Sequence, residues 1–176
     1  MAKAGPKRRD NVKRYGNGRI INAHRGETQA QILATVLAQP HRKGERSHLA
    51  GFVYGRLYMG GMIDSRQFQA AEVYTKRTVR HMGAITGSLP RFPSIAANMI
   101  GTFSTGSGSD PDDETIASIR SAYAELQDAL ADVGMLNEGN AILTRVCIMD
   151  KEIDGAAAMG AFRCALNVIA NRLRIA

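Results

Sequence analysis

The sequence predicts an all-α protein, with a helix-turn-helix-like N-terminal unit followed by a C-terminal three-helix bundle. Three observations predict this fold class. Apolar side chains recur every three or four residues in several segments, residues that cap helix starts precede those segments, and glycine or proline follows their ends. The chain of 176 residues is long enough for one domain with a substantial core, or for two small helical units.

The first segment is strongly basic and lacks the apolar side chains of a core. Residues 2–19 read "AKAGPKRRDNVKRYGNGR", with seven Lys or Arg against one acid, Asp10, and only Val12 and Tyr15 as apolar side chains of any size. Such a segment buries too little surface to offset the entropy of ordering its backbone. We therefore predict a disordered basic arm over residues 1–26. Its candidate nucleic-acid contacts are Lys7, Arg8, Arg9, Lys13, Arg14 and Arg19.

A short helix is predicted next, over residues 27–40, because "ETQAQILATVLAQP" combines good helix formers with a final proline. The stretch "HRKGER", residues 41–46, continues the positive charge. It adds three candidate nucleic-acid contacts, Arg42, Lys43 and Arg46.

The helix-turn-helix prediction rests on two helices joined by a glycine-containing turn. The first, in "SHLAGFVYGRLYMGGM", has Ser47 as its N-cap; the second, in "MIDSRQFQAAEVYTKRTVRHMG", has Asp64 and Gln67 at the positions of a capping box. DNA-reading helices of this kind contact base edges through their N-terminal residues, and here Arg66 suits guanine and Gln69 suits adenine. A plain helical hairpin with an exposed basic flank fits the same residues equally well. The candidate contacts on the second helix are Arg66, Gln69, Lys76, Arg77 and Arg80.

Residues 83–113 break the helical pattern and indicate a boundary between two parts of the chain. They are rich in Gly, Ser, Thr and Pro, which is typical of a connector rather than of a packed element. We place a flexible linker at 101–113. It would join a basic helical, DNA-binding region at 27–100 to an acidic helical bundle at 114–176, which serves packing or oligomerisation.

The C-terminal bundle is predicted from two seven-residue repeats of apolar side chains. "NAILTRVCIMD" between them predicts a third, shorter helix, although its Val and Ile content also fits a strand. The repeats either bury the core of one bundle, which we favour, or join copies of the protein. They consist of Ile116, Ile119, Tyr123, Leu126, Leu130 and Val133, and of Met159, Phe162, Leu166, Ile169 and Leu173.

The sequence offers no catalytic constellation. Walker-type loops, G-x-S-x-G, H-E-x-x-H and C-x-x-C motifs are missing, and the four histidines lie among Lys and Arg, whose positive field opposes a metal cation. We therefore expect no enzyme activity, no metal and no cofactor. Cys147 and Cys164 lie in apolar helical contexts and are expected as buried free thiols. Without a membrane-spanning run or a signal peptide pattern, a cytoplasmic location is expected.

The charge distribution predicts the class of partner. Residues 1–109 carry 17 Lys plus Arg and 5 Asp plus Glu, whereas residues 110–176 carry 6 and 11. Asymmetry on this scale indicates a basic region for a polyanion and an acidic region that stays off it. We expect DNA as the partner, with a duplex favoured and RNA as an alternative. An acidic protein surface would also fit the basic region, and the acidic half would suit a separate protein partner.

The order of these parts resembles that of small helical phage and prophage proteins of alphaproteobacteria. The resemblance rests on the "AGPKRR" type start, the glycine-ended helix before "MIDSRQFQAAEVY", and the final helical unit with "TRVCIMD" and "ALNVIANRL". It implies a DNA-linked phage or bacterial protein, in the host cytoplasm if phage-encoded, and assigns no functional residue. A transcriptional regulator is the leading hypothesis. The alternatives are a small terminase subunit that recognises DNA for packaging in an oligomeric ring, and a protein-binding virion or host-takeover factor.

Overall fold

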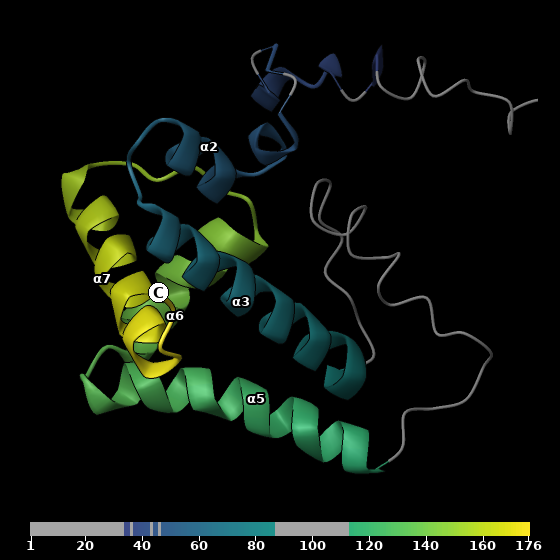
Figure 1. Ribbon diagram of the computed structural model, residues 1–176, viewed down its shortest axis with the longest axis vertical. Helices are drawn as coiled ribbons and strands as arrows, with labels where there is room; N and C mark the ends of the chain where they lie inside the picture. The colour runs from purple at the N-terminus through teal and green to yellow at the C-terminus, as the bar shows by residue number, and fades with distance from the viewer. Residues whose placement is uncertain (1–33, 36, 43, 46, 87–112) are drawn as a thin grey trace, which may run out of the picture. The chain divides into compact units, whose positions relative to one another are not determined.

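The computed structural model describes residues 34–86, except 36, 43 and 46, and residues 113–176 (Figure 1). Every regular element in these residues is helical, and they contain no strand, which confirms the predicted all-α class. The chain divides into two compact units, Met1–Glu45 and Arg46–Ala176. None of the helices in the described part combines the length and apolar character that crossing a membrane requires.

The described elements follow one another along the chain in short steps. In the first unit, Ala34, Thr35 and Leu37 are helical, where the sequence predicts a helix, and the 3₁₀ turn η2 follows at Pro40–Arg42. The second unit contains one 3₁₀ turn, two π-helical turns and the α-helices labelled in Figure 1. Its elements are η3 (His48–Gly51), α2 (Val53–Met59), α3 (Ser65–His81), η4 (Met82–Thr86), α5 (Asp113–Asp132), α6 (Leu136–Leu143), η5 (Thr144–Ile148) and α7 (Ala156–Arg172).

One hydrophobic core joins the helices on both sides of residues 87–112. It includes Tyr74 of α3, Leu126 of α5 and Phe162 of α7, all fully buried, and α3 packs against both α7 and α5. The linker predicted at 101–113 lies outside the described residues except for Asp113, but the helices before and after it share this core. The reason is that α2 has only seven residues and cannot cover the buried face of α3, so the C-terminal helices must cover it.

The region predicted as one helix after Ser47 is two elements. Ser47 caps the 3₁₀ turn η3 by accepting a hydrogen bond from the Leu49 N–H, but the extended backbone of Phe52 then interrupts the helix. Gly55 explains part of this geometry, because a Cβ at this position would overlap the Leu49 carbonyl oxygen and the Phe52 ring. The helix restarts at Val53, whose N–H donates to Asp150 Oδ1 at 2.6 Å.

The start of α3 agrees with the sequence prediction. The Gln67 N–H donates to Asp64 Oδ1 at 2.7 Å, and the Asp64 N–H donates to Gln67 Oε1 at 3.1 Å. These reciprocal bonds form the expected capping box, which satisfies two donors at the helix start.

The apolar repeats of α5 and α7 are buried within the chain's own core, as favoured from the sequence. Leu126 and Leu130 of α5 and Leu166 and Ile169 of α7 are fully buried, whereas Val133, at the end of the first repeat, is 52% exposed. The segment between these helices is helical, as α6 and η5, so the alternative of a strand is wrong. Among the described residues five α-helices therefore contribute to the core, because α2 and α3 join the predicted three-helix bundle.

Several polar groups lie inside this core and are paired. Tyr74 donates its hydroxyl hydrogen to Asn140 Oδ1 at 2.6 Å and lies 3.0 Å from Thr144 Oγ1. Burial raises the pKa of Tyr54, Tyr74 and the Cys147 thiol well above their ordinary values, so all three stay neutral in the folded protein. The sequence expectation of buried thiols is confirmed for Cys147 and is wrong for Cys164, which is exposed on α7.

Candidate nucleic-acid interface

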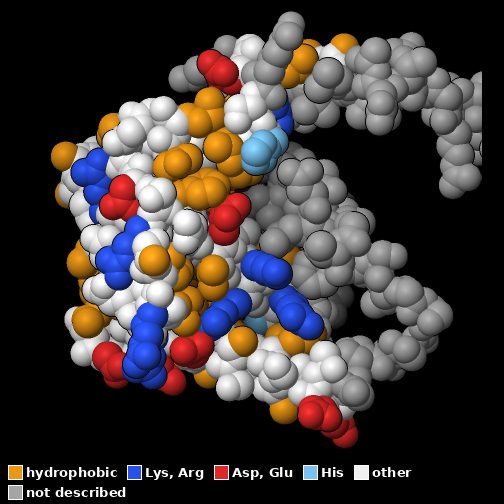
Figure 2. Space-filling view, viewed as in Figure 1, with side chains coloured by type: hydrophobic (Ala, Val, Ile, Leu, Met, Phe, Trp, Pro, Cys, Tyr) orange, Lys and Arg blue, Asp and Glu red, His pale blue; other side chains and the backbone are white. Residues whose placement is uncertain are grey.

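Helix α3 presents an exposed stripe on the side opposite its buried residues. Gln69, Glu72, Lys76 and Arg80 lie three or four residues apart and are exposed, so they follow a single face of the helix. The stripe is polar near the helix start and basic toward its end. Figure 2 shows basic side chains gathered over this part of the molecule.

The first turn of α3, where base-reading residues were expected, is bound to α7. Arg66 donates from Nε to the Ile175 carbonyl at 2.8 Å and from Nη2 to Asn171 Oδ1 at 2.6 Å. Gln67 donates from Nε2 to Asn167 Oδ1 at 3.0 Å. Of the two candidate base contacts, Arg66 is therefore engaged within the protein and Gln69 is exposed. This arrangement matches the helical hairpin with a basic flank more closely than a free recognition helix.

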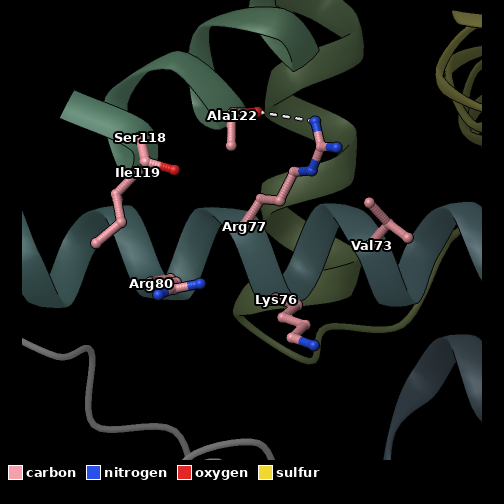
Figure 3. A pocket seen from close by; sticks show the side chains of 7 residues that line it. All are labelled: Val73, Lys76, Arg77, Arg80, Ser118, Ile119 and Ala122. Atoms are coloured by element: carbon pink, nitrogen blue, oxygen red, sulfur yellow. Dashed lines mark hydrogen bonds between the residues drawn. The ribbon is translucent and has the colours of Figure 1, made fainter. Parts of the chain in front are cut away.

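A cleft of about 300 Å³ opens between the second half of α3 and the first half of α5. Figure 3 shows Arg77 crossing from α3 toward α5, while the Lys76 side chain extends away from α5. Arg77 donates from Nη1 to the Ala122 carbonyl at 3.0 Å and to Glu125 Oε2 at 2.7 Å, so its charge is neutralised. We call this site the α3–α5 cleft; it is lined by Val73, Lys76, Arg77, Arg80, Ser118, Ile119 and Ala122.

Lys76 and Arg80 differ from most cations of the second unit because they have no hydrogen bond or ion pair with any described residue. Arg120 of α5 also has no such bond with a described residue, so α3 and α5 together carry three of these cations. Two more, Lys151 and Arg174, lie elsewhere. The arginines held within the unit by acids, amides or carbonyl groups are Arg56, Arg66, Arg77, Arg145, Arg163 and Arg172.

A histidine and a tyrosine brace the end of α3 against α5. The rings of His81 and Tyr123 are stacked, with centroids 4.1 Å apart and planes inclined by 16°. Partial burial, and then the nearby Arg120 guanidinium, lower the pKa of His81. The histidine is therefore neutral near pH 7, and the positive charge of the region comes from Lys and Arg.

The remaining sequence-predicted contacts belong to the first unit or lie outside the described residues. Arg42, in η2 of the first unit, has a buried side chain with 8% exposure. The others lie outside the described residues: Lys7, Arg8, Arg9, Lys13, Arg14, Arg19, Lys43 and Arg46.

Sequence reasoning missed the α5 side of the cleft. Ser118, Ile119 and Ala122 were interpreted only as part of a helix in the C-terminal bundle, because nothing in their local sequence indicates that α5 packs on α3. The described residues contain no group of three or more His, Cys, Asp or Glu side chains that could hold a metal ion. Comparison of the chain with protein-family models, curated proteins and solved structures finds no match.

Proposed function

We propose that this protein is a non-enzymatic nucleic-acid-binding protein that uses a basic first segment and the basic end of α3. The observation that carries the proposal is the location of the charge excess. Residues 47–86 and 113–176 hold 11 Lys plus Arg and 11 Asp plus Glu, whereas residues 1–46 hold 11 and 3. The second unit is balanced, so the excess belongs to the first 46 residues.

A phosphate backbone fits this distribution for a specific reason. Each phosphate that Lys or Arg neutralises releases a condensed counterion, so a dense run of cations gains affinity from a polymeric anion that scattered cations do not. The run "KRRDNVKR" places five cations within eight residues. Duplex DNA is the favoured ligand for this segment and RNA the alternative, since phosphate contacts do not by themselves distinguish the two.

Transcriptional regulation is the role that we favour, because the chain attaches a basic segment to a small helical unit. A small terminase subunit would use the same contacts but requires a ring of many copies. Light scattering of the purified protein separates these roles, since a monomer or dimer argues against the ring. A virion or host-takeover factor that binds an acidic protein would bind no nucleic acid at low salt.

The proposal is tested by replacing Lys7, Arg8, Arg9, Lys13, Arg14 and Arg19 with Gln in the full-length chain. We expect weaker binding to all DNA sequences, and a slope of log K against log salt that is smaller by about 5. The control is Lys151→Gln with Arg174→Gln, which removes unpaired cations from the balanced unit and should change the slope little. Unchanged affinity in the six-residue variant would refute the proposal.

A further inference from the structure

The α3–α5 cleft combines two features that a simple basic surface lacks. Lys76 and Arg80 supply unpaired positive charge at its edge, while Val73, Ile119 and Ala122 supply an apolar lining beside that charge. A phosphate contact on a convex surface needs only the charge. The apolar lining gains free energy only if a ligand brings apolar surface along with its anion.

Two cations of the cleft, Lys76 and Arg80, have no ion pair with any residue that the structure describes. Lys76 and Arg80 are one helical turn apart, and like charges at this spacing repel. Glu125 neutralises Arg77 between them but bonds neither Lys76 nor Arg80. Glu72, one turn before Lys76, also makes no ion pair with it. An anion bound beside Lys76 and Arg80 would relieve their repulsion.

The size of the cleft limits the form of that anion. A volume of about 300 Å³ lies at the small end of ligand pockets and suits one nucleotide rather than a double helix. In a duplex the bases are stacked inside, so only phosphates could touch the cleft edge. In a single strand the sugar and base next to each phosphate are accessible, and they can lie on an apolar surface.

We propose that the α3–α5 cleft binds one unpaired nucleotide of a single strand, with its phosphates beside Lys76 and Arg80 and its sugar or base against Val73, Ile119 and Ala122. The Ser118 hydroxyl lines the same cleft and can donate to a phosphate or accept from the base. This inference rests on the proposed function and adds a preference to it. The first segment binds any phosphate backbone, and the cleft selects unpaired nucleotides.

The experiment compares two probes on the full-length protein by fluorescence anisotropy. One is a single-stranded oligonucleotide of about 20 nucleotides, and the other is the duplex of the same sequence, both at about 100 mM salt. Lys76→Gln with Arg80→Gln should weaken single-strand binding about tenfold and duplex binding by less than about threefold. The matched control, Lys151→Gln with Arg174→Gln, removes the same charge away from the cleft and should weaken both probes slightly and equally.

A second variant tests the apolar lining without changing the charge. Ala122→Leu fills the cleft and should also weaken the single strand selectively. If Lys76→Gln with Arg80→Gln weakens the two probes alike, or if Ala122→Leu leaves single-strand binding unchanged, the inference is overturned. An oligoglutamate peptide that displaces the single strand as well as unlabelled oligonucleotide does would overturn it in favour of an acidic protein. Failure of the unmodified protein to bind either probe would instead refute the proposed function.

Discussion

Gly55 is the residue whose identity the local structure constrains most. A Cβ at this position would overlap the Leu49 carbonyl oxygen and the Phe52 ring, which are held by η3 and the interruption before α2. From the sequence we expected one continuous helix through this position. The close approach exists because the chain folds back at Phe52, and that turn was not predicted.

We predict that Gly55→Ala lowers the free energy of unfolding by about 1 to 3 kcal/mol, because the backbone must shift to admit the methyl group. Gly160→Ala is the matched control, since a Cβ at Gly160 meets open space on the exposed side of α7. That substitution should raise the free energy of unfolding by about 0.5 to 1 kcal/mol through helix propensity. Urea denaturation of the two variants measures both effects, and equal midpoints would contradict the prediction.

Arg66 shows why the chemistry of a residue type did not fix its role. Its side chain has the donors that a guanine contact needs, and its place at a helix start was predicted correctly. The structure instead gives those donors to Ile175 and Asn171, which are more than 100 residues further along the chain. Lys76 and Arg80, on the same helix, have no such partner among the described residues and are exposed. The difference depends on the packing of α7, which local sequence does not report.

At the scale of elements, the sequence predicted the features that depend on neighbouring residues. It did not predict those that depend on residues far along the chain. The capping box of α3 follows from residues within a few positions of the helix start. The start of α2 depends on Asp150, which is 97 residues away from Val53. The segment after Ser47 therefore looked like one helix, although the fold supplies a second start within it.

Asp150 carries a prediction about α2. Its carboxylate accepts the Val53 N–H at the positive end of this helix, and its own backbone is in the left-handed region, with φ of 52°. Asp150→Ala should destabilise the protein by about 1 to 2 kcal/mol, because it removes the cap and leaves a residue that tolerates this φ poorly. Asp150→Asn keeps an acceptor and tolerates the backbone, so it should cost less. Thermal unfolding of both variants gives the comparison, and a larger loss in Asp150→Asn would argue against capping.

At the scale of the whole molecule, the sequence predicted the helical class but not the core that helices from both sides of residues 87–112 share. Composition made 83–113 look like a domain boundary, and the charge counts of the two halves supported this interpretation. The buried face of α3 nevertheless needs α5 and α7, so helices from both sides form one core. Composition describes a segment by itself, whereas a shared core is a property of the surfaces that the segments bury together.

The shared core leads to a final prediction, which concerns a shortened chain. In the part of the chain that the structure describes, every buried apolar residue of the core cluster lies at position 52 or later, so residues 47–176 should fold cooperatively without the first 46. We expect the melting temperature of this shortened protein to stay within about 5 °C of the full-length value, because all described residues of the core cluster are kept. The same protein should lose most of its affinity for duplex DNA, since its Lys and Arg no longer outnumber its acids. Calorimetry and a binding titration on one preparation measure both quantities. If the shortened protein melts far below the full-length chain, the first unit stabilises the second. If the shortened protein binds duplex DNA with unchanged affinity, the phosphate contacts lie on the helices of the second unit.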